Sequence, residues 1–430
     1  MTDEGTHETQ TLRLISREFE GFEKAFALQA EAFSRNRPDL RVACEFIEIG
    51  QLYETMVAGG GAAGAGHDLF LCVTDWLPEA ISKDLLEPLD GYLAADPPPG
   101  WPDAWAPSMR GLQRGPDGKT YGLPYHDGPE VLMYRTDLFG DPGEQARFRR
   151  EHGRDLAPPE TWAQFLEVAR FFTRPDEGLY GTCVAAYPDG HNNVYDFLIH
   201  LWSRGGALFD AAWRPRFHDA PGQDALRFYA DLFHTHKVVS PECLALDSVK
   251  CGFHYAAGKA AMMWNWCGFA AVAEVPQFSQ IVGRNACALV PRGDGPGGRH
   301  TSLNIFWVLA IPAGSTRKKQ AYAFLKHVAG AEMDKVTSMA GGNGTRLSTW
   351  RDPEVQATYS YYRIIERVHE AVHSPPSIPE YPAVNEVLSQ MVDSVATGRR
   401  EAPQALLEAA QATEQIMAEA GYYRRAGCFR

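Results

Sequence analysis

The spacing of apolar and polar residues divides the N-terminal third of the chain into alternating strands and helices. Residues 12–16 and 41–49 have strand patterns, and residues 67–74 are nearly all apolar, which is typical of a parallel strand covered on both faces. Between the first two strands, residues 19–33 place several phenylalanines on one face of a helix. This order predicts a doubly wound sheet, in which ligands bind beyond the carboxyl ends of the strands.

A central stretch, residues 118–139 (GKTYGLPYHDGPEVLMYRTDLF), is extended and mostly apolar. It is broken midway by His126 and Asp127. Polar side chains within a buried strand pattern cost free energy unless they have partners. We therefore expect His126 and Asp127 to face a ligand-binding cleft.

The remaining pattern predicts a second set of α/β elements. Strands are expected at residues 181–186, 258–266, 286–290 and 302–311, helices at 222–237 and 318–329, and a surface helix or turn at 85–93. The chain has 430 residues, more than the ~250–300 at which a single core stops growing, so we expect two lobes.

Composition narrows the classes of function. A net charge of -13 argues against nucleic acid as the main partner, because binding its backbone requires a basic face. No apolar run approaches the ~18 residues of a membrane span. The 8 cysteines form no C-x-x-C pair and are expected to be buried free thiols. No signal peptide is visible in this chain, because its first residues are polar.

One motif offers catalytic chemistry. His369, Glu370 and His373 form an H-E-x-x-H pattern, which on a helix places two imidazoles on one face with a glutamate as base. Pro375 follows closely and ends any such helix. A zinc-dependent hydrolase therefore stays open as an alternative, while the main expectation includes no catalytic residue, no metal and no cofactor.

Aromatic and polar residues gather instead at predicted strand ends and loop starts. Aromatic faces suit the C–H faces of sugars, and carboxylates and amides can bind several hydroxyls at once. These residues favour a carbohydrate site.

The order of motifs resembles the family 1 extracellular solute-binding proteins of ABC importers, the maltodextrin-binding group in the wide sense. The motifs that carry this resemblance, which covers nearly the whole chain, are PDLRVACEFIEI, HDLFLCVTDW, LLEPLDGYL, the central stretch, PPETWAQFLEVA, FHYAAGKAAMMWNW, GGNGTRLS and EAPQALLEAAQATEQIM.

The resemblance implies a two-lobe α/β periplasmic-binding-protein fold of type II, with the ligand cleft between lobes joined by a multi-crossing hinge. The implied N-terminal lobe is residues 1–124 plus 292–340, and the C-terminal lobe is 125–291 plus 341–430. The implied stacking platform is Trp266, and the implied polar anchors are Asp127 and Arg346. The full set of implied ligand contacts is Glu18, Phe19, Trp76, Tyr125, His126, Asp127, Tyr187, Asp189, Trp264, Asn265, Trp266, Asn304, Phe306, Gly342, Asn343 and Arg346.

The implied function is capture of a small carbohydrate (a sugar, oligosaccharide, polyol or sugar acid) by hinge closure. The ligand would pass to the transmembrane subunits of an ABC permease. By resemblance the protein is a monomer in the periplasm or another extracytoplasmic space. A cytoplasmic ligand sensor with the same fold is a further alternative.

Overall fold

The computed structural model describes residues 9–423, and its contacts divide the chain into two units. Unit 1 comprises Met1–Gly128, Asn304–Glu366 and Ser374–Pro379, and unit 2 comprises Pro129–Leu303, Arg367–His373 and Glu380–Arg430. Residues 1–8 and 424–430, which the predicted lobes include, lie outside the described residues, as does Cys428. Each unit is therefore assembled from separate segments of the chain.

Unit 1 is built on a 5-stranded sheet with the order β2-β1-β3-β10-β4. The middle strand β3 (Leu69–Val73) is buried at every position, as its continuous apolar run predicts. It pairs in parallel with β1 and antiparallel with β10, and β1 is also parallel to β2. The bounds of the other strands are β1 Gln10–Arg17, β2 Leu40–Ile47, β4 Leu123–His126 and β10 Trp307–Ala310.

Helix α1 (Glu20–Asn36) covers this sheet with its phenylalanine face, as the sequence predicts. The ring of Phe26 stacks on Tyr125 of β4 with 4.4 Å between centroids. Helices α12 (Lys318–Val328) and α13 (Ala331–Met339) pack beside α1. The remaining helices in or entering unit 1 are α2 Ile49–Tyr53, the π-helix Glu54–Ala58, α3 Leu77–Ser82, α4 Asp90–Ala95, α14 Leu347–Trp350, α15 Pro353–Thr358, α16 Tyr362–His369 and the short 3-10 helices Gly61–Ala63 and Pro107–Met109.

Unit 2 is built on a 4-stranded sheet with the order β6-β7-β5-β8. Its strands are β5 Glu130–Arg135, β6 Tyr180–Cys183, β7 Ala260–Trp266 and β8 Asn285–Ala288. Strands β5 and β7 are antiparallel, and their register places Glu130 opposite Trp266. A small parallel ladder joins β9 (Ser302–Leu303) to β11 (Val372–His373).

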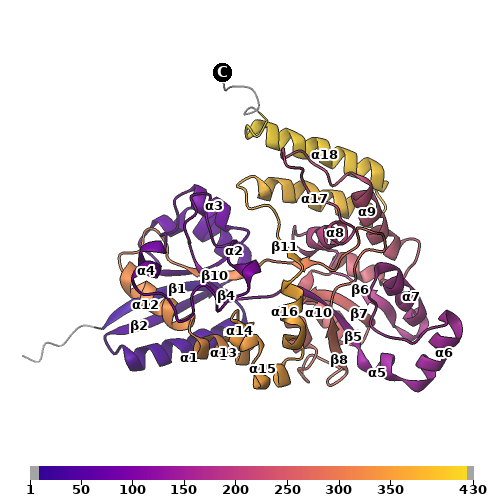
Figure 1. Cartoon of the computed structure of the whole chain (residues 1–430), viewed down its shortest axis with the longest axis horizontal. Coiled ribbons are helices and arrows are strands. Elements are labelled where there is room, and N and C mark those ends of the chain that lie inside the picture. The colour runs from indigo at the N-terminus through magenta and orange to yellow at the C-terminus, as the bar shows by residue number, and fades with distance from the viewer. Residues whose placement is uncertain (1–8, 424–430) are drawn as a thin grey trace, which may run out of the picture. The chain divides into compact units, whose positions relative to one another are not determined.

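Helices surround the unit 2 sheet, and α8 (Asn192–Ser203) is buried along its whole length. Helices α17 (Tyr381–Ala396) and α18 (Ala402–Glu419) lie side by side and pack on α8 and α9 (Figure 1). The other α-helices are α5 Thr136–Gly140, α6 Pro142–His152, α7 Trp162–Phe172, α9 Ala220–Phe233, α10 Ser248–Ala256 and α11 Gly268–Val272.

The structure differs from the sequence prediction at several boundaries. The strand predicted at 302–311 is two strands, β9 in unit 2 and β10 in unit 1. Within 85–93 a helix forms only at the end, because Leu86 bridges Pro312 instead. Residues 292–303 belong to unit 2, and residues 341–366 belong to unit 1 rather than to the second lobe.

The placement of residues 341–366 has a local cause. The backbone N–H of Thr345 donates to Oδ1 of Asp334 on α13 at 2.8 Å, and Trp105 Nε1 donates to Thr345 Oγ1 at 3.0 Å. These bonds fix the segment to unit 1.

The cysteines and the hydropathy of the helices are typical of a globular protein. Every described cysteine is a free thiol, and Cys72, Cys183, Cys243, Cys251 and Cys267 are buried. Within residues 9–423, no helix has the length and apolar character needed to cross a bilayer.

Candidate functional site

The first group of candidate residues lies in unit 2 on the loop that joins β6 to α8. Tyr187 is 47% exposed there, and the Asp189 carboxylate accepts the backbone N–H of His191 at 2.9 Å. Gly190 adopts a φ of 75°, a left-handed conformation that favours glycine. The loop therefore holds an aromatic ring, a carboxylate and an imidazole at the surface.

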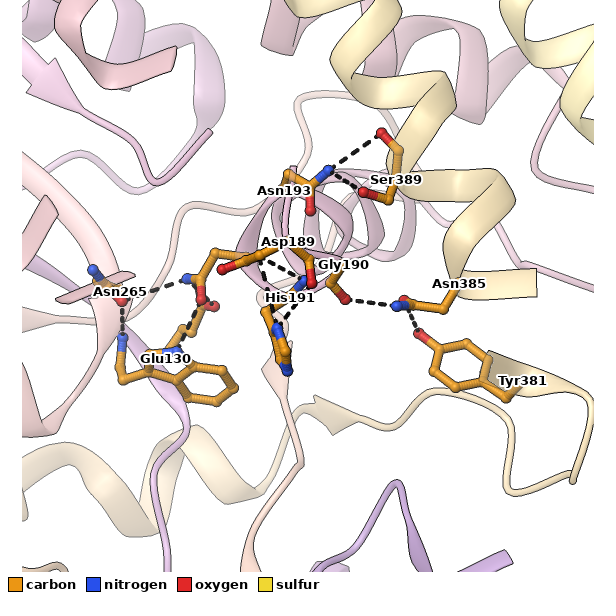
Figure 2. Close-up of polar contacts among 11 residues, drawn as sticks. Glu130, Asp189, Gly190, His191, Asn193, Asn265, Tyr381, Asn385 and Ser389 are labelled. Atoms are coloured by element: carbon orange, nitrogen blue, oxygen red, sulfur yellow. Dashed lines mark hydrogen bonds and ion pairs between the residues drawn. The ribbon is translucent and has the colours of Figure 1, made fainter. Parts of the chain in front are cut away.

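Side chains of helix α17 hold this loop through hydrogen bonds. Asn385 Nδ2 donates to the carbonyl of Gly190 at 2.6 Å, and Tyr381 donates to Asn385 Oδ1 at 3.2 Å (Figure 2). One turn further along, Ser389 accepts from Asn193 Nδ2 at 2.9 Å. These bonds tie the loop to a long helix.

The second group in unit 2 lies at the end of β7. Trp266 is partly exposed, and its indole Nε1 donates to Oδ1 of Asn192 at 3.0 Å. Its backbone N–H donates to Oδ1 of Asn265 at 2.8 Å, and its ring is nearly perpendicular to that of Tyr195, with 5.8 Å between centroids. Trp266 is thus held in one orientation with part of its surface open.

The neighbouring predicted contacts Trp264 and Asn265 are inside the core. Trp264 is 1% exposed, and its Nε1 donates to Asp196 Oδ1 at 2.7 Å. Asn265 is fully buried, with its amide nitrogen donating to the carbonyl of Ser248. Trp264 therefore packs within the core, whereas Asn265 also fixes the backbone of Trp266.

In unit 1, an aromatic cluster forms where β1, β3 and β10 meet their loops. Trp76 packs edge-to-face on Trp307 with 5.7 Å between centroids. The Arg17 guanidinium lies 5.7 Å from the Trp307 ring and 5.9 Å from Phe19. Burial lowers the pKa of Arg17, with Glu48 opposing the shift. Glu18 and Phe19 are exposed at the rim of this cluster.

His126 and Asp127 pair with the loop that follows α13. The backbone N–H of Asn343 donates to Nδ1 of His126 at 2.8 Å, and the backbone N–H of Asp127 donates to the carbonyl of Asn343 at 2.9 Å. Burial and the Arg17 charge lower the pKa of His126 to about 3. The ring is therefore neutral and carries its proton on Nε2.

Arg346 has an internal role. Its guanidinium donates to the carbonyls of Ala329 at 2.6 Å and Pro99 at 2.7 Å, and it stacks over Trp105. Gly342 lies close to Thr337, where an added Cβ would come within 2.8 Å. Through these contacts, Arg346 and Gly342 determine the shape of the loop around Asn343.

The other predicted contacts in unit 1 also have structural partners. Tyr125 is buried and donates to Gln29 Oε1 at 3.0 Å. Asn304 Nδ2 donates to the carbonyl of Ser108, and the carbonyl of Phe306 accepts from the Thr74 N–H. They position the cluster rather than presenting an open surface.

The H-E-x-x-H residues do not form a metal site. His369 ends α16, whereas His373 belongs to β11, so the two imidazoles are not on one helix. Among residues 9–423, no group of three or more histidine, cysteine, aspartate or glutamate side chains is arranged to hold a metal ion. The zinc hydrolase alternative has no support in this geometry.

Sequence reasoning missed Glu130, Asn192 and Asn385. Asn192 lies in the loop motif YPDGHNN, and Glu130 is the one acid in the apolar strand EVLMYR. An acid in such a strand could have indicated a buried polar network, whereas no pattern marks Asn385 on α17.

Two α/β units, each with aromatic and polar residues beyond its strand ends, are typical of two-lobe solute-binding proteins. Residues 17–335 match the model of the bacterial extracellular solute-binding protein family, and the chain belongs to that family. This confirms the family expected from the sequence.

Known relatives cover almost the whole chain. The mannitol-binding protein of Pseudomonas aeruginosa is 28% identical over 425 residues, spanning 91% of this chain and 90% of its own. The maltose-bound MalE3 of T. maritima aligns with a TM-score of 0.81 at 22% identity, covering 94% of this chain and 99% of that one. An ABC transporter solute-binding protein of Agrobacterium radiobacter K84, solved with ribitol, has a TM-score of 0.81 at 23% identity over 94% and 98% of the two chains. These likenesses confirm the predicted fold class.

Proposed function

We propose that the protein captures a small polyol or sugar outside the cytoplasm and delivers it to an ABC permease. The observation that carries this proposal is the similarity to a mannitol-binding protein over nine-tenths of both chains. The fold is also that of proteins solved with ribitol and maltose. No comparison supports the hydrolase or the cytoplasmic sensor.

The exposed groups suit a neutral, hydroxyl-rich ligand. Trp266 and Tyr187 offer apolar ring faces to C–H groups, and Asp189 and His191 offer polar atoms to hydroxyls. In unit 1, Trp76 and the neutral His126 offer the same combination. Capture would follow from closure of the units, which the ligand drives by binding the closed state more tightly.

Calorimetric titration with D-mannitol, ribitol and maltose tests this proposal, with a sugar acid as a charged comparison. Thermal unfolding provides a second readout, because a ligand at ~100 times its dissociation constant adds about 2.7 kcal/mol of stability. Binding of one polyol or sugar class is the expected result. Failure of every compound to bind would overturn the proposal, and a shift only with zinc would favour a metalloprotein.

Closure and oligomeric state need their own measurements. Small-angle scattering should show a smaller radius of gyration when mannitol or another binding compound is added. Light scattering should give a mass near 47.6 kDa for a monomer. An unchanged radius at saturation would argue against closure, and twice the mass would argue against a monomer.

A further inference from the structure

The carboxyl group of Glu130 lies inside unit 2, behind the ligand-facing residues. The side chain is fully buried at the first position of β5. Its Oε1 accepts from Asn192 Nδ2 at 3.2 Å, and its Oε2 has no hydrogen-bond partner among the described residues. Ser302 Oγ donates to its backbone carbonyl at 2.6 Å, which fixes the start of the strand. A buried acid with one oxygen committed to an asparagine amide calls for an explanation.

Chemistry determines which way the Asn192 amide points. An indole N–H can only donate, so the atom that faces Trp266 Nε1 must be the amide oxygen. The amide nitrogen then faces Glu130 Oε1, with a longer contact of 3.4 Å to Asn265 Oδ1. Glu130 therefore favours the amide orientation that receives the Trp266 proton.

The arrangement repeats once along the same helix and strand. Asn192 and Asp196 are one turn apart on α8, and Trp266 and Trp264 are on the same face of β7. Each helix residue accepts the indole proton of one tryptophan. The Asp196 bond holds a buried ring, whereas the Asn192 bond holds the ring that is partly exposed.

We propose that Glu130 is a positioning residue that sets the orientation of the Trp266 ring through Asn192, and thereby the affinity of unit 2 for its ligand. This inference rests on the proposed function, because it assigns Trp266 to the ligand surface. Glu130 acts only through Asn192 and does not itself touch the ligand.

The surroundings of the Glu130 carboxyl group show why glutamine is its conservative replacement. Burial and the nearby Asp196 raise the pKa of Glu130 well above its usual range. Tyr229 on α9 and Cys251 on α10 are the other titratable groups that interact with it, and both are themselves neutral by burial. Glutamine has the same shape and charge as the protonated acid and keeps an acceptor at Oε1.

The test compares Glu130→Leu with Glu130→Gln in two measurements. In protein labelled with ¹⁵N-tryptophan, the Trp266 indole signal is identified by its loss in Trp266→Phe. Without ligand, Glu130→Leu should shift this signal, and Glu130→Gln should leave it nearly in place. Titration with D-mannitol, or with whichever panel compound binds, should show about tenfold weaker affinity for Glu130→Leu, as expected when a buried donor loses its acceptor, and near-normal affinity for Glu130→Gln.

Ser203→Ala is a matched control. Ser203 Oγ accepts the indole proton of Trp162 at 2.9 Å, so this variant removes a similar bond to a buried tryptophan elsewhere in unit 2. It should reduce stability without changing the Trp266 signal or the affinity. Equal affinity and an unmoved Trp266 signal in Glu130→Leu would overturn the proposal, and so would the same losses in Ser203→Ala.

The two proposals can fail separately. If no panel compound binds the unchanged protein, the proposed function and the affinity part of this inference are wrong. The indole signal of the ligand-free protein still decides whether Glu130 orients Trp266. If Glu130→Leu does not fold, failure of Glu130→Gln to keep the Trp266 signal would be the overturning result.

Discussion

The backbone N–H of Asn343 donates to Nδ1 of His126, joining a loop of unit 1 to the end of β4, which is far away in sequence. The bond requires an unprotonated Nδ1, and the low pKa of His126 keeps it so at neutral pH. This contact makes part of the stability of unit 1 dependent on pH.

The stability contributed by His126 should be lost as the pH falls. Its pKa is about 3 in the folded protein against 6.5 for the free group, so the unfolded chain takes up the proton first. Between pH 6.5 and pH 5, the free energy of unfolding should fall by ~2 kcal/mol more in the unchanged protein than in His126→Asn. Asparagine keeps an acceptor near Asn343 but does not titrate.

Urea unfolding at a series of pH values measures this difference. Other buried histidines, such as His200, also lower the free energy of unfolding as the pH falls. Because they do so equally in both proteins, their contribution cancels in the comparison. Parallel curves for the two proteins would contradict the assignment.

The Asp334 carboxylate should be essential to the loop that carries Asn343. Its two oxygens accept the backbone N–H groups of Thr345 at 2.8 Å and Arg346 at 3.1 Å. Asp334→Ala leaves both donors buried and should lower the free energy of unfolding by ~3 kcal/mol or more. Glu332→Ala, an exposed acid on the same helix, is the control and should change little. Equal effects in chemical denaturation would show that the loop does not depend on this carboxylate.

Replacement of Trp266 should affect ligand affinity, whereas replacement of Trp264 should affect stability. Trp266→Ala should weaken ligand binding by ~10-fold or more, because it removes the partly exposed ring. Trp264→Phe should mainly lower stability, since Asp196 Oδ1 loses its indole donor inside the core. Calorimetric titration and thermal unfolding of both variants separate the two effects. Loss of affinity in Trp264→Phe without loss of stability would contradict this division.

Asn385 should influence binding from outside the ligand surface. Its amide holds the Gly190 carbonyl at 2.6 Å, so Asn385→Ala should loosen the loop of Tyr187 and Asp189 and weaken binding several-fold. Gln390→Ala, at an exposed position of the same helix, should bind normally. Hydrogen exchange of the loop amides would show the cause, and unchanged protection in Asn385→Ala would argue against it.

The sequence predicts the positions of helices and strands better than it predicts the tertiary contacts between residues. The apolar run of β3 and the phenylalanine face of α1 are local patterns, and the structure confirms both. The sequence predicts one strand at 302–311, because nothing in its apolar pattern shows that its two halves join different units.

The site residues show the same limit. Nothing near Arg346 in the sequence indicates that its guanidinium binds the carbonyls of Ala329 and Pro99. Trp264 and Trp266 look alike in the motif MMWNW, and only the packing of α8 separates the buried ring from the partly exposed one. The sequence could nominate aromatic and polar candidates, but their division into exposed and buried residues depends on tertiary contacts.

The position of β10 also governs the order in which the chain can fold. This strand lies between β3 and β4 and holds the unit 1 sheet together, yet it follows the whole segment Pro129–Leu303 in sequence. During synthesis, the edge of β3 stays unpaired and β4 has no sheet partner until β10 is made, and unpaired edges are prone to associate with other chains. The segment of this protein that is made first is therefore completed by a strand that is made much later.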